Sequence, residues 1–90
     1  MSQSYQQRDG LRAQVLGEET MVFDEQTDQV HVLNATSAFV WKCLEQPRDA
    51  GTIEKQISEE FDVEGKDVPA IVATALEQLE SKGLVQPVPA

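Results

Sequence analysis

Three short runs in the first third of the chain have the strand-like pattern of apolar residues, with a period of two in the first and last of them. They cover Leu11–Leu16, residues 20–23 and Gln29–Leu33. This period is typical of strands that bury one face. The five residues 24–28, which separate the last two runs, are polar and turn-like. We therefore expect these two runs to pair as an antiparallel hairpin.

After Leu33 the period of the apolar residues changes from 2 to 3.6, which predicts helices. Asn34 is a good N-cap for a first helix over about residues 35–45, with Thr36 or Ser37 as alternatives. Pro47 prevents this helix from continuing. One face of the helix carries Ser37, Val40, Trp41 and Leu44, so we interpret Trp41 as a core anchor rather than a stacking platform.

Two further helices follow. The second has two possible N-caps, Asp49 and Thr52, and Asp49 fits better because it gives a continuous apolar stripe of Ala50, Ile53, Ile57 and Phe61. The third covers about residues 66–82 and begins near Asp67, because a proline at position 69 is tolerated only in the first turn. Gly83 would end it. Its apolar face consists of Val68, Ile71, Val72, Ala75, Leu76 and Leu79.

The order of three strands and three helices predicts one α+β domain. The last two helices resemble a helix-turn-helix, and the preceding three-stranded antiparallel sheet makes the expected fold winged helix-turn-helix-like. Residues 1–10 are polar and are expected to form a flexible N-terminal arm. The domain itself is expected to cover residues 11–85. Pro87 and Pro89 are expected to end the structure within a tail at 86–90.

The charge of the chain excludes several classes of partner. Its 90 residues include 16 acidic and 7 basic side chains, a formal net charge of −9. Such a surface repels nucleic acid and anionic membranes and attracts a basic peptide or protein. The sequence shows no signal peptide, no apolar run long enough to span a bilayer, and a single cysteine that cannot form an internal disulfide. We therefore expect a cytoplasmic protein.

Candidate catalytic groups all have a simpler interpretation. Cys43 and His31 suggest a thiol–imidazole pair, but no third group orients them, and Cys43 fits better as a small residue near the core. His31 is interpreted as a strand-face residue, with peptide contact as the alternative. The carboxylates at 59, 60 and 62 fit a solvated helix end. Neither a Cys–His cluster for a metal nor a glycine-rich phosphate loop is present in the sequence. We expect no catalytic residue, no metal and no cofactor.

The segment Val30 to Trp41, VHVLNATSAFVW, resembles the central signature of the PqqD-like family. That signature is a strand ending in Leu-Asn, a small helix-starting segment and an aliphatic–Trp pair. The resemblance continues through residues 49–63 and 76–85, and in all it extends from about Leu11 to Val85, nearly the whole chain. Two positions depart from the pattern. Glu45-Gln46 replaces an Asp-Gly turn, and Thr27-Asp28 stands where the hairpin often has a glycine, although Asp tolerates a left-handed conformation better than most residues.

The resemblance implies a recognition element for ribosomally synthesised, modified peptides. Such a protein binds the leader region of a precursor peptide without catalysis and presents it to a modifying enzyme, such as a radical SAM maturase or a leader protease. A homodimer is possible.

The expected binding site combines a sheet edge with the flank of the third helix. An exposed edge strand offers unpaired N–H and C=O groups to a peptide that adds as a further strand. Similarity to the family puts the groove beside the third helix, although Ile71 and Ala75 could be core residues only. The candidate residues are Gln29, Val30, His31, Val32 and Leu33 of the strand, and Ile71, Ala75 and Gln78 of the helix.

Two other functions compete with peptide binding. A winged-helix DNA-binding regulator would need basic residues on the third helix. That helix carries Asp67, Glu77 and Glu80 against Lys66 and Lys82, and the hairpin turn is acidic. A generic winged-helix adaptor or dimerisation domain is the second alternative. An enzyme is the least favoured.

Overall fold

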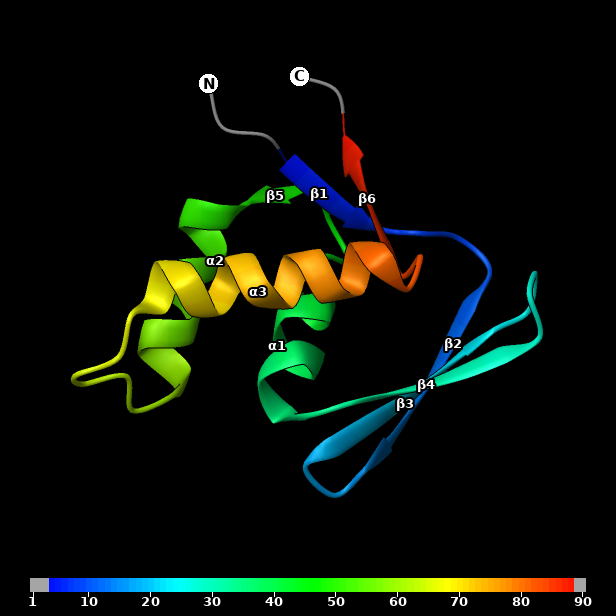
Figure 1. Ribbon diagram of the computed structural model, residues 1–90, viewed down its shortest axis with the longest axis horizontal. Coiled ribbons are helices and arrows are strands. Elements are labelled where there is room, and N and C mark those ends of the chain that lie inside the picture. Colours follow the sequence, from blue (N-terminus) through cyan, green and yellow to red (C-terminus); the bar gives the residue numbers. More distant parts are fainter. Residues whose placement is uncertain (1–3, 89–90) are drawn as a thin grey trace.

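The computed structural model describes residues 4–88 and shows two small antiparallel sheets and three helices (Figure 1). The strands are β1 (Ser4–Gln7), β2 (Leu11–Leu16), β3 (Glu19–Asp24), β4 (Gln29–Leu33), β5 (Arg48–Asp49) and β6 (Val85–Val88). The helices are α1 (Ala35–Cys43), α2 (Ala50–Glu60) and α3 (Val68–Ser81). The predicted order of three strands and three helices is confirmed for β2 to α3, except that the two-residue strand β5 lies between α1 and α2.

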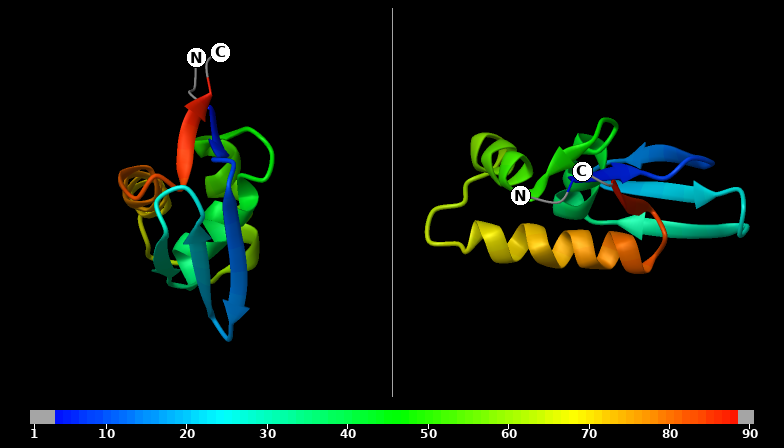
Figure 2. Two further views of the ribbon diagram at one scale, coloured as in Figure 1. Left: turned by 90° about the vertical axis from the view of Figure 1, so that its right-hand side faces the viewer. Right: turned by 90° about the horizontal axis from the view of Figure 1, so that it is seen from above.

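The larger sheet has the order β2-β3-β4, and both pairs are antiparallel. The predicted hairpin of β3 and β4 is confirmed, with Val22 opposite His31 and Thr20 opposite Leu33. Asp28 in its turn adopts the left-handed conformation, at φ 60°, that an aspartate tolerates better than most residues. Seen from above, β4 is the strand on the α3 side of this sheet (Figure 2).

Each helix begins at an aspartate or asparagine whose side chain accepts a backbone N–H three residues later, as the sequence predicted. Asn34 Oδ1 accepts from Ser37 at 2.9 Å, Asp49 Oδ1 from Thr52 at 2.8 Å and Asp67 Oδ1 from Ala70 at 3.2 Å. Helix α1 ends at Cys43, two residues before the predicted end, because its last turn tightens: the Leu44 N–H donates to the Trp41 carbonyl.

The end of α3 turns the chain back along the helix. Gly83 has φ 74°, and its N–H donates to Glu80 while the Leu84 N–H donates to Leu79. This pair of bonds is a Schellman motif, which needs a residue in the left-handed region and so favours glycine. The motif buries Leu84 and directs Val85 into β6.

The core is a single cluster of side chains from β3, β4, the three helices and the start of β6. Trp41 is its largest member: it is 5% exposed, and its indole N–H donates to the Leu84 carbonyl at 3.2 Å. Its predicted role as a core anchor is confirmed. The stripe predicted for α2 holds for Ile53 and Ile57, but Phe61 lies just beyond the helix and is 37% exposed.

The structure places strands in both terminal segments, which we expected to lie outside the domain as an N-terminal arm and a C-terminal tail. Residues 4–7 and 85–88 pair as β1 and β6, and β5 completes a second sheet of order β5-β1-β6. The polar sequence SYQQ of β1 lacks the alternation of apolar and polar residues that predicts a strand. Its pairing with β5 and β6 uses backbone N–H and C=O groups, which do not depend on the type of side chain. Pro87, opposite Tyr5, is accommodated because β6 is an edge strand. Residues 1–3, 89 and 90 lie outside the described part.

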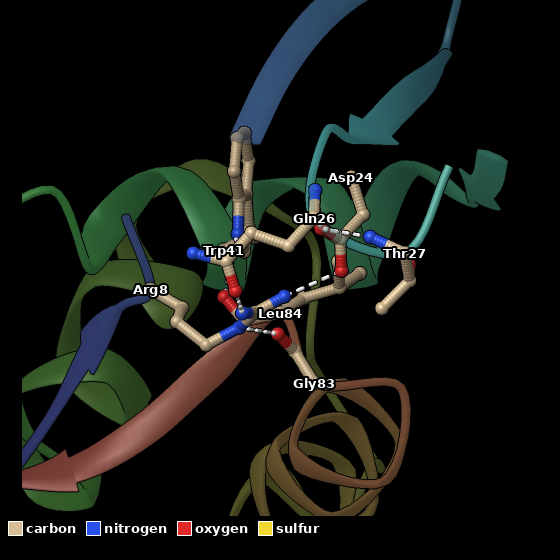
Figure 3. A network of polar contacts seen from close by, with 7 residues as sticks. All are labelled: Arg8, Asp24, Gln26, Thr27, Trp41, Gly83 and Leu84. Atoms are coloured by element: carbon tan, nitrogen blue, oxygen red, sulfur yellow. Dashed lines mark hydrogen bonds and ion pairs between the residues drawn. The ribbon is translucent and has the colours of Figure 1, made fainter. Parts of the chain in front are cut away.

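A polar network joins the two sheets to the end of α3 (Figure 3). The guanidinium of Arg8, which follows β1, forms an ion pair with the Asp24 carboxylate. It also donates to the Gln26 side-chain oxygen at 2.6 Å and to the Gly83 carbonyl at 2.5 Å. Asp24 is 2% exposed and also accepts the N–H groups of Gln26 and Thr27. One side chain thus connects the hairpin with α3.

The Asp24 carboxyl has a pKa below its ordinary value. Burial acts to raise this pKa, but hydrogen bonds from Gln26 and Thr27, together with the charge of Arg8, outweigh burial. The unfolded chain therefore takes up the proton at a higher pH than the folded chain does. The stabilisation is fully present above the ordinary aspartate pKa of about 4 and is lost as pH falls through the lower folded value.

Replacing Trp41 with alanine should lower the free energy of unfolding by about 3–5 kcal/mol, because it empties a large site in the core. Urea unfolding followed by circular dichroism measures the loss. Lys42→Ala, at the exposed neighbouring position of the same helix, should change stability by less than about 1 kcal/mol. An unchanged unfolding midpoint for Trp41→Ala would contradict the core assignment.

Replacing Asp24 with asparagine should destabilise the protein at pH 7 and remove part of its sensitivity to acid. The difference in urea midpoint between wild type and Asp24→Asn should shrink as the pH falls from about 5 to 3. Asp9→Asn, at an exposed position, is the control. A difference that stays constant over this range would show that the Asp24 charge is not the stabilising feature.

Candidate functional site

A groove of about 570 Å³ lies between the N-terminal end of α1 and one side of α3. Both helices begin there, so the groove is bordered by two helix starts. Its lining residues are mostly small or polar. They are Asn34, Thr36 and Ser37 from the start of α1, Lys66 and Asp67 before α3, and Ala70, Ile71, Thr74, Ala75 and Gln78 of α3.

The three α3 residues predicted for the site all line this groove. Ile71, Ala75 and Gln78 follow one another at steps of four and three, which places them along one side of a helix. Ile71 is half-buried and Gln78 is exposed. Ala75 is 4% exposed, so it belongs to the core and also forms part of the groove surface. Ile71, in contrast, lines the groove without belonging to the buried core cluster.

Strand β4 is an edge of its sheet, as predicted, because its only strand neighbour in the described residues is β3. Leu33 is buried and His31 half-buried, whereas Gln29, Val30 and Val32 are exposed. None of these five residues lines the groove. The groove instead begins at the next residue along the chain, Asn34. Sheet edge and groove are therefore two adjoining parts rather than one pocket.

The sequence interpretation missed the wall that α1 provides. Asn34, Thr36 and Ser37 were considered as possible helix caps, and Ser37 also as part of the inner face of the helix, because nothing local shows which helix α1 will face. Ala70 and Thr74 were also missed, although a signal was available: they precede Gln78 at steps of four and so share its side of α3.

The groove itself carries little net charge. Lys66 and Asp67 are its only ionisable residues, and they have opposite signs. The side-chain oxygens of Asn34 and Asp67 already accept helix N–H groups. The remaining lining consists of methyl, hydroxyl and amide groups. This surface suits the apolar side chains of a peptide whose backbone N–H and C=O groups are hydrogen-bonded outside the groove.

His31 carries an unsatisfied buried atom. Its Nε2 has no hydrogen-bond partner among the described residues, although the side chain is half-buried on β4. A buried polar atom without a partner costs free energy that a ligand could recover. Its neighbours Val30 and Val32 have no polar side-chain atom, so this unsatisfied group is a feature of His31 alone among the three.

Cys43 does not have the surroundings of a nucleophile. Burial raises the pKa of its thiol, and the charge of Arg48 opposes this effect only in part. A raised pKa reduces the thiolate population on which nucleophilic attack depends. Within residues 4–88, no group of three or more His, Cys, Asp or Glu side chains is placed to hold a metal ion.

Helices α1, α2 and α3 are too short and too polar for any of them to span a bilayer.

Comparison with known proteins identifies the family. Residues 19–85 match the family described as PqqD, coenzyme PQQ synthesis protein D. This chain belongs to the PqqD family. The matched region runs from the start of β3 to the start of β6, and includes β4, the groove and Trp41. Curated proteins gave no match to the chain.

Two solved structures share the fold. One is TbiB1 in complex with the TbiA(beta) leader peptide, with 22% identity and a TM-score of 0.74, covering 94% of this chain and 99% of that one. The other is a lasso peptide synthetase B1 complexed with its leader peptide, with 18% identity and a TM-score of 0.75, covering 92% and 98%. Both alignments extend beyond residues 19–85, and at these identities they show a common fold.

The Cys43 thiol should react slowly with iodoacetamide in the native state. We expect a rate at least about twofold below that of the urea-unfolded chain at pH 8, because the raised pKa and partial burial both lower the reactive population. Mass spectrometry of quenched samples measures both rates. A native thiol that reacts faster than the unfolded one would point to an activated nucleophile.

Proposed function

We propose that this protein binds the leader region of a ribosomally synthesised precursor peptide and presents it, without catalysis, to a modifying enzyme. The observation that carries the proposal is the junction of two features: the free edge of β4 and the groove beside α3 that begins where β4 ends. A cytoplasmic location fits a role in the maturation of a newly made peptide.

The edge of β4 supplies the first half of the binding mode. In the described residues its outer side has no strand neighbour, so its free N–H and C=O groups can pair with an added antiparallel strand. Such backbone pairing gives affinity with little selectivity, because every peptide offers the same groups. The unsatisfied Nε2 of His31 is buried, so a side chain of the bound strand could reach it only if the imidazole ring turns outward.

The groove supplies selectivity. A peptide along β4 that continues past Leu33 reaches Asn34 and the adjoining surface of α3. Ile71 and Ala75 offer apolar contact there, and the Gln78 amide offers both a donor and an acceptor. The short side chains at 70, 74 and 75 leave room for one or two large apolar side chains of the peptide.

The comparisons support the same function. The chain belongs to the PqqD family, and the two similar structures are both complexes with leader peptides. The fold also supports a winged helix-turn-helix-like description, with α2 and α3 as the helix pair and β3–β4 as the wing. The modifying enzyme could be a radical SAM maturase or a leader protease.

A role in DNA binding is disfavoured by charge. The exposed side of α3 carries Glu77 and Glu80, and the turn of the β3–β4 hairpin carries Glu25 and Asp28. Phosphate groups would be repelled at both positions where a winged helix contacts DNA. A gel shift at low salt should therefore show no complex.

Replacing Ile71 with aspartate should weaken leader binding by about 100-fold, because a charge would face an apolar side chain of the bound peptide. Ala73→Asp is the matched control: it introduces the same charge two residues away, at an exposed position outside the groove. The ligand is the labelled leader of a precursor peptide encoded beside the gene of this protein. Fluorescence anisotropy measures its affinity, and circular dichroism checks that both variants fold.

Nuclear magnetic resonance titration then locates the peptide. Amide shifts should concentrate on β4, on residues 34–37 and on the Ile71 side of α3. Shifts confined to β2 or to α2 would show that the docking mode is wrong even if the leader binds. Equal losses for Ile71→Asp and Ala73→Asp would remove the groove from the explanation and leave a nonspecific effect of charge.

A further inference from the structure

The outer face of the larger sheet carries an apolar patch. In β3 and β4, Phe23 stands directly opposite Val30, and Met21 directly opposite Val32. Directly opposite residues point to the same side of a sheet, and this side is the reverse of the one that buries Val22 and Leu33. We call this surface the outer patch. Its members are Leu16, Met21, Phe23, Val30 and Val32.

The outer patch breaks the usual rule for a sheet of this kind. An antiparallel sheet with one face on the core normally presents polar side chains on the other face. Here Val30 is 53% exposed, Val32 54% and Leu16 47%. A group of exposed apolar side chains on adjacent strands indicates an interaction surface more often than a scattered single residue does.

Acidic side chains border the outer patch at both ends. Glu18 lies in the turn between β2 and β3, Glu19 begins β3 opposite Leu16, and Glu25 and Asp28 lie in the turn between β3 and β4. The one basic residue on this face, Arg12 opposite Phe23, is already paired with Glu25 at 2.5 Å. The border is therefore strongly negative.

This charge decides which occupant fits. A second copy would bring another acidic border, and a chain with a formal charge of −9, against the first, so self-association is opposed by repulsion. A partner protein with an apolar centre and a Lys- or Arg-rich border is complementary in both respects. The five apolar side chains would form the centre of such an interface, and the acidic side chains at its border would form the polar rim.

We infer that the outer patch is the docking surface for the peptide-modifying enzyme, a protein with an apolar patch bordered by basic residues. This inference rests on the proposed leader-binding function. Val30 and Val32 belong to the strand whose edge would take the leader, so an enzyme on the outer patch lies directly beside the bound peptide. A leader that pairs with β4 would add a fourth strand to this sheet, and its side chains on the outer face would enlarge the outer patch. The enzyme should therefore bind the leader complex more tightly than the free protein.

The test compares neighbouring residues of one strand. Leu16→Glu places a charge on the outer patch, while Val15→Glu places the same charge on the opposite face at a similar exposure, 56% against 47%. Leu16 lies on β2, two strands from the β4 edge, so its replacement leaves the leader site intact. Val30→Glu adds a second position within the patch. Circular dichroism and unfolding midpoints establish that all three variants fold.

Two affinities are measured for each variant. Fluorescence anisotropy gives the affinity for the labelled leader of the neighbouring precursor gene. Calorimetry gives the affinity for each purified enzyme encoded by the flanking genes, with and without saturating leader. We expect Leu16→Glu and Val30→Glu to weaken enzyme binding at least about tenfold, while Val15→Glu changes it less than about twofold. Leader affinity should stay within about twofold for Leu16→Glu, and added leader should strengthen enzyme binding to the wild type.

The outcomes separate this inference from the proposed function. Enzyme binding that is equal for wild type, Leu16→Glu and Val30→Glu overturns the docking surface, as does a wild type that binds the leader but none of the enzymes. A wild type that sediments as a dimer, and a Leu16→Glu variant that sediments as a monomer, would assign the patch to self-association instead. Failure of the leader to bind, with enzyme binding still sensitive to Leu16→Glu, would overturn the proposed function while leaving the patch as an enzyme contact.

Discussion

The arrangement of the proposed site depends on the contacts of one guanidinium group. Arg8 binds the Asp24 carboxylate at the end of β3, the Gln26 side chain in the hairpin turn and the Gly83 carbonyl after α3. The hairpin carries β4, and α3 carries the groove residues, so these contacts fix the two halves of the site relative to each other. Because Asp24 is buried, loss of Arg8 would leave its carboxylate charge uncompensated. The hairpin and the end of α3 therefore have little freedom to move apart.

The second sheet holds Arg8 in place. The Gln7 N–H donates to the Leu44 carbonyl and the Arg8 N–H to the Leu84 carbonyl, while the Gln7 side chain donates to the Trp41 carbonyl. Leu84 in turn accepts the indole N–H of Trp41. Strands that seem remote from peptide binding therefore belong to the support of the site, through a continuous path of hydrogen bonds from β1 to the core.

The sequence predicted those features that have local causes. Asn34, Asp49 and Asp67 cap the helices through bonds that span three residues, and Gly83 adopts a conformation that few other residues accept. Trp41 could be placed in the core because its neighbours on the helix are apolar. Each of these signals is contained within one or two turns of chain, so no knowledge of the tertiary structure was needed.

The features that could not be predicted all depend on contacts between distant segments. The β1–β6 pairing joins residues about eighty positions apart through backbone groups alone. The role of Arg8 requires Asp24 and Gly83 to come together first. The α1 wall of the groove depends on how two helices pack, whereas the α3 side followed from helical spacing. For this reason the helix residues of the site were predicted and most of their neighbours were not.

The groove also shows how a domain of this kind can change its preferences during evolution. Most of its lining, including Ala70, Thr74 and Gln78, is exposed and contributes nothing to the buried core. Longer or bulkier side chains at these positions would reshape the groove at little cost in stability, so recognition can diverge while the scaffold stays constant. Ala75 differs from these three, because it belongs to both the groove and the core, and a larger residue there would disturb both. Related sequences should therefore vary freely at 70, 74 and 78 and keep a small residue at 75.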